Sequence, residues 1–251
     1  MQAPCNDAAG IRGEKKAMTA NEIHRILQKE ADPTIATHSG RFFKTGTGEY
    51  GEGDQFLGIR VPVLRAFARQ YPDMALAEVN HLLQSPWHEE RLLALFMLVQ
   101  RFKKGAAKEK QKVVAMYMKN RRYINNWDLV DSSACHILGS WLADRERAPL
   151  YRLAASKRLW DRRMAIMATL HFIRLDQFDD TLQLARILRN DAEDLIHKSV
   201  GWMLREIGKR DRSVAEDFLR FHCRHMPRTM LRYAIERFPE AQRKRYLRGA
   251  V

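Results

Sequence analysis

Apolar residues recur every three or four positions along most of the chain from about residue 20, a spacing that is typical of amphipathic helices. Alternating apolar and polar positions, which would indicate strands, are nearly absent. The sequence therefore predicts an all-α protein. The clearest helical stretches are residues 90–102, 112–120, 162–173, 180–189 and 193–207, and Pro72, Pro86, Pro149, Pro227 and Pro239 interrupt the pattern between helices.

Several of these stretches resemble one another. Each starts with a polar, proline or tryptophan cap, carries charge in its first turn and then stays apolar for two or three turns. The segments are SPWHEERLLALFML, NNWDLVDSSACHIL, RLWDRRMAIMATL, DLIHKSVGWML and MPRTMLRYAIERF. Repetition at roughly 30 to 40 residues predicts an α-solenoid of HEAT-like or armadillo-type helix pairs with a continuous concave surface. An irregular helical bundle is the alternative.

One segment, residues 41–65, breaks the helical pattern because it is rich in glycine. Gly46, Gly48 and Gly51 match the dinucleotide-binding pattern G-x-G-x-x-G. No βαβ context surrounds them, and the neighbouring acidic side chains would repel a pyrophosphate, so we reject that reading. We expect instead a β-hairpin over about residues 42–58, in which RFFKT pairs with DQFLGI and Gly46, Gly48, Tyr50, Gly51 and Gly53 form the turn. Such a hairpin could probe a DNA groove or cap the first repeat.

The N-terminal region lacks the apolar run of a signal peptide, and no apolar stretch approaches the roughly 18 residues of a membrane span. We expect residues 1–18 to be a disordered leader that precedes a single domain, residues 19–251. Met18 is an alternative start, because Thr19 and Glu22 have the spacing of a capping box.

The chain is strongly basic, with 44 Lys and Arg against 30 Asp and Glu, a net charge of +14. Nucleic acid is the commonest partner of such a surface, and basic residues spread along a concave wall suit a DNA backbone better than a membrane. We therefore expect a DNA-binding monomer.

The three cysteines, Cys5, Cys135 and Cys223, are widely spaced and include no C-x-x-C pair. This spacing favours a reducing cytoplasmic location. His222, Cys223 and His225 form a tight group, but no second ligand pair has zinc-site spacing. We predict no metal and no cofactor.

The segment NNWDLVDS holds the candidate chemistry. Asn126 is a suitable N-cap for a helix that begins at Trp127, and Asp128 suits the first turn of that helix. Asp131 follows Trp127 by four residues, so the two side chains share a helical face. That face differs from the apolar one, and we expect it to point towards the concave surface.

Similar segments place further candidates on the same wall. If equivalent helices stack, Trp127, Arg163 and Trp202 project from successive repeats. The expected DNA-backbone contacts are Arg162, Arg163, Lys119, Arg121, Arg122 and Lys198.

The blocks NNWDLVDS, LWDRRMAI and HKSVGWMLRE resemble the HEAT-like repeat DNA glycosylases of the AlkD type, the DNA alkylation repair family. The resemblance runs from about residue 20 to about residue 245. It implies that Asp131 is the catalytic acid, that Trp127 and Trp202 are aromatic contacts and that Arg163 is the arginine of the family's second block. Phe42 stands where a tyrosine would be expected near the site.

The chemistry implied by the resemblance is excision of N3- or N7-alkylated purines from DNA. Such a base is cationic and leaves readily, so a fixed carboxylate that stabilises the positive charge developing on the sugar is sufficient. The glycine-rich segment resembles the hairpin of the AlkF/AlkG-type subfamily, which implies the alternative of a non-catalytic binder of three-way and Holliday junctions. A protein-binding HEAT scaffold is the third hypothesis.

Overall fold

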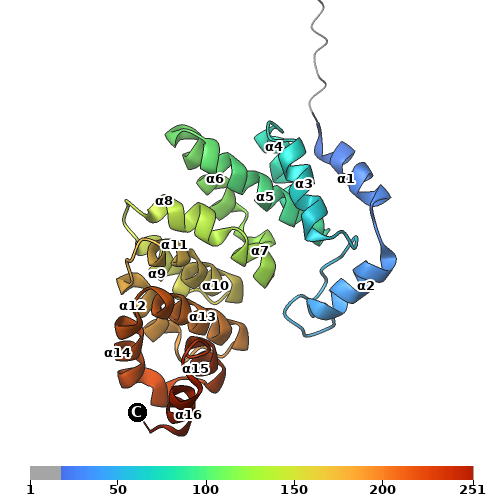
Figure 1. Cartoon of the computed structure of the whole chain (residues 1–251). Helices are drawn as coiled ribbons and strands as arrows, with labels where there is room; N and C mark the ends of the chain where they lie inside the picture. The colour runs from blue at the N-terminus through green and yellow to red at the C-terminus, as the bar shows by residue number, and fades with distance from the viewer. Residues whose placement is uncertain (1–17, 251) are drawn as a thin grey trace, which may run out of the picture.

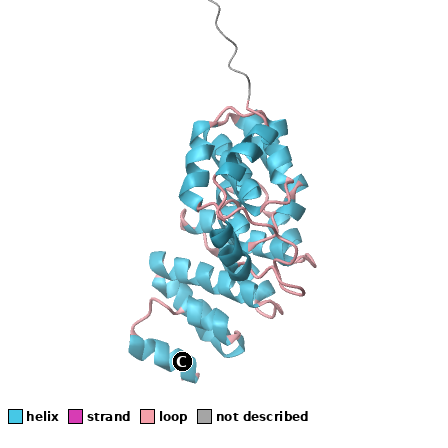
Figure 2. Cartoon of the chain, turned by 90° about the vertical axis from the view of Figure 1, so that its right-hand side faces the viewer, coloured by secondary structure: helices cyan, strands magenta, loops and turns pink. Residues whose placement is uncertain are grey.

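The computed structural model describes residues 18–250, and these residues form α-helices, short 3-10 and π-helical turns, and connecting loops (Figures 1 and 2). The prediction of an all-α protein is confirmed. The predicted leader, apart from Met18, lies outside the described residues. The elements are α1 (Ala20–Lys29), α2 (Pro33–Phe42), α3 (Val61–Gln70), α4 (Leu76–Leu83), α5 (His88–Lys104), α6 (Ala107–Lys119), η1 (Arg121–Tyr123), α7 (Trp127–Asp131), η2 (Cys135–Gly139), α8 (Ser140–Leu142), α9 (Ala148–Ala154), α10 (Leu159–Ala168), α11 (Leu170–Ile173), α12 (Asp179–Leu188), α13 (Asp194–Arg210), α14 (Arg212–His222), η3 (Cys223–His225), α15 (Arg228–Ala234) and α16 (Glu240–Arg248).

The helices form two rows that run in chain order. In what we call the inner row, α5 packs on η2, η2 and α7 pack on α10, α10 packs on α13, and α13 packs on α15. A second row is made of α4, α6, α9, α12 and α14, each packed against inner-row elements. Figure 1 shows the stack running from α3 and α4 at the top to α16 at the bottom, with α1 and α2 along one side. The five similar sequence segments supply the whole inner row, with α7 and η2 both coming from NNWDLVDSSACHIL, so their resemblance reflects equivalent positions in the stack.

Two glycines allow neighbouring inner-row helices to approach closely. A Cβ atom on Gly139 would lie 2.2 Å from the carbonyl oxygen of Ala168, and one on Gly201 would lie 2.4 Å from that of Met230. Any side chain at either position would push the helices apart. Close packing of this kind leaves little room for relaxation, so these contacts fix the helix spacing.

Charged side chains fill the first turn of α5 although they are almost completely buried. Glu89 accepts hydrogen bonds from the backbone N–H groups of Leu57, Gly58 and Ile59 at 2.9, 2.8 and 3.2 Å. Glu90 lies 2.5 Å from Nδ1 of His24 on α1. The N-terminal dipole of α5 favours both carboxylates. This single turn therefore joins α5 to α1 and to the segment before α3.

The predicted β-hairpin is wrong. No strand occurs in the described residues, and residues 44–54 fold instead into consecutive turns, with Glu49 N bonded to Gly46 O at 3.0 Å and Asp54 N to Gly51 O at 3.1 Å. Only an isolated bridge, Gln55 to Trp87, resembles sheet pairing in this part of the chain. The physical reason is that the N–H groups of residues 57–59, in the expected second strand, donate to Glu89 and so are not available for pairing with a first strand.

Gly58 shows why this segment requires glycine. Its φ is +83°, and a Cβ atom there would lie 2.0 Å from the carbonyl oxygen of Asp32. Gly48 and Gly53 also have positive φ values, of +77°, at which side chains are strained. The glycines therefore permit tight turns and close packing of the loop against α2.

We expect Glu89→Ala to lower the free energy of unfolding by roughly 3–5 kcal/mol, because three buried N–H groups lose their acceptor. Urea denaturation monitored by circular dichroism measures this loss. Glu30→Ala is the matched control, since Glu30 is exposed at the end of α1 and its removal should cost less than about 0.5 kcal/mol. Similar stability for the two variants would contradict the anchoring role of Glu89.

Candidate active site

An ion pair between Asp131 and Arg163 links consecutive inner-row helices. Arg163 donates from Nε and Nη2 to the two carboxylate oxygens of Asp131 at 2.9 and 2.8 Å, and from Nη1 to the carbonyl oxygen of Leu195 at 2.6 Å. The pair thus connects α7, α10 and the start of α13. A two-point contact of this kind fixes the plane of the carboxylate as well as its position.

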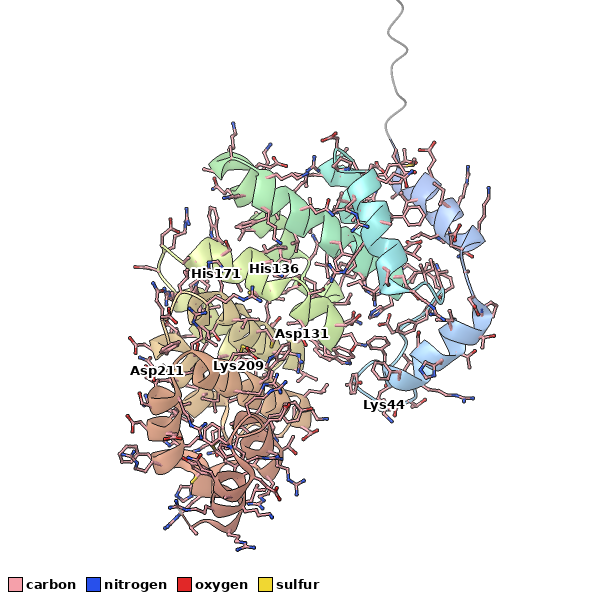
Figure 3. All side chains as sticks on the ribbon, in the orientation of Figure 1. Lys44, Asp131, His136, His171, Lys209 and Asp211 are labelled. Atoms are coloured by element: carbon pink, nitrogen blue, oxygen red, sulfur yellow. The ribbon has the colours of Figure 1, made fainter. Side chains whose placement is uncertain are left out.

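The Asp131 carboxylate is nearly enclosed, with 14% of its side chain exposed. Burial raises the pKa of Asp131, and the nearby Arg163 guanidinium opposes this shift without cancelling it. The acid is therefore held in an environment that disfavours its charge, with one cation as its partner. Figure 3 shows Asp131 on the side of the stack that faces α2 and the segment with Lys44.

Aromatic rings surround Trp127, the residue one turn before Asp131. Phe43 stacks on the Trp127 indole with ring centroids 5.3 Å apart, and Phe42 meets it edge-on at 5.9 Å. Tyr50 reaches from the glycine-rich segment to Trp160 on α10, again edge-on at 5.9 Å. The glycine-rich segment consequently lies against α7 and α10, and supplies part of the wall beside Trp127.

A buried histidine connects the glycine-rich segment to α7. His88 at the start of α5 contacts Asp54 through Nδ1 and Asp128 through Nε2, both at 2.8 Å. Its ring also stacks on Phe56 and lies against Phe43, with centroid distances of 4.5 and 5.0 Å.

The charge of His88 follows from its two carboxylate partners. Burial lowers the pKa of His88, but hydrogen bonds and charge from Asp128 and Asp54 outweigh burial and raise the pKa to about 9. The imidazole is therefore a cation at neutral pH. Arg91, which also donates to Asp54, balances the remaining negative charge.

Sequence reasoning placed Asp128 in the first helical turn, but missed its partner. Asn126 caps α7 by accepting from Trp127 N at 2.9 Å, as predicted. Asp128 accepts from Leu129 N and also holds His88. The sequence signal for this network was the run HEER at residues 88–91. Four consecutive ionisable residues cover every face of a helical turn, including the face that an amphipathic helix buries.

The predicted basic contacts divide into two kinds. Arg162 pairs with Asp191 at 2.6 Å, Arg121 lies 3.5 Å from Asp161, and Lys198 pairs with Asp194 at 2.7 Å. Lys119 and Arg122 have no acidic partner within 4.0 Å among residues 18–250. Arg163 is buried against Asp131, rather than projecting from the wall as expected.

Trp202 does not join the aromatic group around Trp127. Its indole N–H donates to Glu206 at 2.9 Å, and its ring lines an open hollow with Leu170, Arg174 and Lys209. The structure thus brings Asp131, Arg163, Trp127 and Phe42 into one region and places Trp202 elsewhere on the inner row.

Two other features of the described residues bear on the class of protein. Residues 18–250 include no group of three His, Cys, Asp or Glu side chains arranged to hold a metal ion, and the His222, Cys223 and His225 group is no exception. No helix in that range has the length and apolar character needed to cross a membrane.

Comparison with known proteins assigns the family. The model of the DNA alkylation repair enzyme family matches residues 23–238, so the chain belongs to that family. A solved structure described as a predicted DNA alkylation repair enzyme from Enterococcus faecalis is similar in fold, with a TM-score of 0.65 and 19% sequence identity. The match covers 84% of this chain and 97% of that one. No curated protein sequence matches.

We expect the His88 network to make stability depend on pH. Because the folded-state pKa is about 9 and the ordinary value is 6.5, the stabilisation is fully present below pH 6.5 and is lost as pH rises through 9. The shift corresponds to a loss of up to about 3 kcal/mol. Urea denaturation of the wild type and of His88→Gln at several pH values measures it.

The His88→Gln variant should be less stable at pH 6.5 and should lose less of its stability as the pH rises. His81→Gln, a change to an exposed histidine on α4, should follow the wild-type curve. Parallel curves for the wild type and His88→Gln would show that His88 is not the titrating group.

Proposed function

We propose that this protein is a monofunctional alkylpurine DNA glycosylase, which hydrolyses the N-glycosidic bond of cationic N3- or N7-alkylated purines in duplex DNA. The observation that carries the proposal is the fixed carboxylate of Asp131 beside the Trp127 indole, in a chain of the DNA alkylation repair enzyme family. The helix pairs would then be degenerate HEAT-like repeats whose basic concave surface holds the duplex.

The chemistry requires little of the protein beyond charge stabilisation. When the bond between C1′ and the base nitrogen breaks, the alkylated purine leaves as a neutral base and the positive charge moves to the sugar. A carboxylate held in a low-dielectric site stabilises that charge more strongly than one in water. Water then adds to C1′ and gives up a proton, which Asp131 could accept.

Arg163 and the aromatic rings have complementary roles in this proposal. Arg163 holds the carboxylate plane in one orientation, so little reorganisation is needed when the sugar becomes positive. The Trp127 indole face attracts cationic groups and could lie against the alkylated nucleotide. Phe42, at the edge of Trp127, and Trp202, further along the row, are proposed DNA contacts.

The remaining partners follow from charge. We propose that Lys119, Arg121, Arg122, Arg162 and Lys198 contact the DNA backbone, with Lys119 and Arg122 the most available because no acid within the described part of the chain pairs with them. The protein would act as a cytoplasmic monomer without a cofactor. Steep loss of DNA binding with rising salt would distinguish this role from that of a protein-binding scaffold.

We expect Asp131→Asn to reduce release of 7-methylguanine from methylated duplex by roughly 10²- to 10³-fold while duplex affinity is kept, because the neutral amide stabilises a cation much less than a carboxylate does. Chromatography of released bases and fluorescence anisotropy measure the two quantities. Asp217→Asn, an exposed aspartate on α14, is the matched control. No release by the wild type would reject the proposal.

Base release needs ionised Asp131, and burial raises its pKa, so the rate should increase with pH through an apparent pKa above the ordinary value of about 3.9 and then level off. Single-turnover rates, corrected for spontaneous depurination, give the profile. A rate that rises as the pH falls would require an acid catalyst in place of an ionised carboxylate.

The alternative function is that this protein binds branched DNA without catalysis, as its resemblance to the AlkF/AlkG-type subfamily implies. That hypothesis relied on a β-hairpin, and residues 44–54 form turns instead. We therefore expect similar affinity for linear duplex and four-way junctions in gel-shift titrations. Tighter junction binding that is lost on deletion of residues 46–53 would favour the alternative.

A further inference from the structure

A group of basic side chains lies on the inner row beyond the Asp131 site. It consists of Lys103 on α5, His136 on η2, His171 on α11 and Arg174, the residue that follows α11, and we call it the basic row. His136 and His171 are labelled next to each other in Figure 3 and are near enough to interact electrostatically, and Arg174 Nη1 lies 3.6 Å from Sγ of Cys135, the neighbour of His136. His136, His171 and Arg174 are at least partly exposed.

The backbone brings these residues together. Residues 135–139 form a π-helical turn, a feature often found at functional sites. Gly139 follows His136 by three residues, and a Cβ atom there would lie 2.9 Å from Cβ of His171. Because Gly139 has no side chain, η2 lies directly against α11, and this contact places His136 near His171.

No acid is paired with the basic row in the described part of the chain. Lys103, His136, His171 and Arg174 have no Asp or Glu within 4.0 Å among residues 18–250, whereas Arg163 and Arg162 are both paired. Cations at helix carboxyl ends are favoured by the helix dipole. That accounts for one or two of them, but Lys103 and Arg174, lying unpaired beside two imidazoles that can take up protons, together raise the local potential enough to attract an anion.

The state of His136 reflects this potential. Burial lowers the pKa of His136, and the charges of Lys103, Arg174, His171 and Arg65 lower it further, to about 4. Burial and the charges of Arg174 and Arg147 also lower the pKa of His171. Both rings are therefore neutral in the free protein at pH 7.

We infer that Lys103, His136, His171 and Arg174 form a binding site for a phosphodiester of the DNA backbone. The inference rests on the proposed DNA-binding function and adds a contact region to it. A bound phosphate supplies the missing negative charge and accepts hydrogen bonds from the guanidinium and from a protonated imidazole. DNA binding should then be coupled to proton uptake by His136, and affinity should rise as pH falls.

The test uses an unmodified linear duplex, so that base release does not enter the measurement. Fluorescence anisotropy gives the affinity of the full chain at pH 5 to 8 and at several salt concentrations. We expect wild-type affinity to rise by up to about tenfold per pH unit as the pH falls. His136→Gln should flatten this dependence. Arg174→Gln should weaken binding and reduce the salt slope by about 1.

Controls separate this site from general charge and from folding. Lys108→Gln removes an exposed cation near the start of α6 and should leave the pH dependence unchanged. Thermal denaturation checks that the variants fold. NMR titration of the His136 ring should show its pKa raised by duplex. If inorganic phosphate alone raises it equally at similar concentration, the site recognises a free anion and not DNA.

The outcomes also distinguish the inference from the proposed function. The phosphodiester site would be overturned if His136→Gln and Arg174→Gln both kept the affinity, salt slope and pH dependence of the wild type. This holds whether or not the protein releases alkylated bases. Weakened duplex binding in these variants, together with no base release by the wild type, would support the site while rejecting the glycosylase proposal.

Discussion

Buried charge at the first turn of α5 is the constraint on which the N-terminal half depends. Charged groups removed from water must find partners, and here each partner belongs to a different segment. Glu89 binds the backbone before α3, Glu90 contacts α1, and His88 joins the glycine-rich segment to α7. Each of these contacts depends on where α5 begins. Because His88 holds Asp128, the neighbour of Trp127, the first turn of α5 also fixes the position of Trp127 about forty residues later in the chain.

The Asp131–Arg163 pair imposes a second constraint. Burial makes the charged acid costly, and Arg163 offsets part of that cost while it fixes the carboxylate. A carboxylate that is held rigidly but incompletely neutralised retains the capacity to stabilise a new positive charge nearby. The same arginine binds Leu195 O, so the geometry of the acid is linked to the stacking of three inner-row helices.

Charge is distributed unevenly along the inner row. Glu89 and Asp128, with their partners, occupy amino-terminal turns, whereas Lys103 and Arg174 lie at carboxyl ends and have no acidic partner within 4.0 Å among residues 18–250. Helix dipoles favour both placements. A duplex lying across this row would meet the Asp131 carboxylate at one edge, which suits a sugar that becomes positive. At the other edge it would meet Lys103 and Arg174, which suit a phosphate backbone.

The sequence alone indicated the all-α fold, the similarity of the five inner-row segments and the N-cap of α7, because apolar periodicity and capping residues act locally. It also brought Trp127 and Asp131 together, since i,i+4 spacing fixes a shared face. Only the tertiary structure decided that Arg163 binds Asp131, that Trp202 lies apart and that residues 44–54 form turns. Those outcomes depend on contacts between residues far apart in the chain, such as Glu89 with Gly58, which no local pattern records.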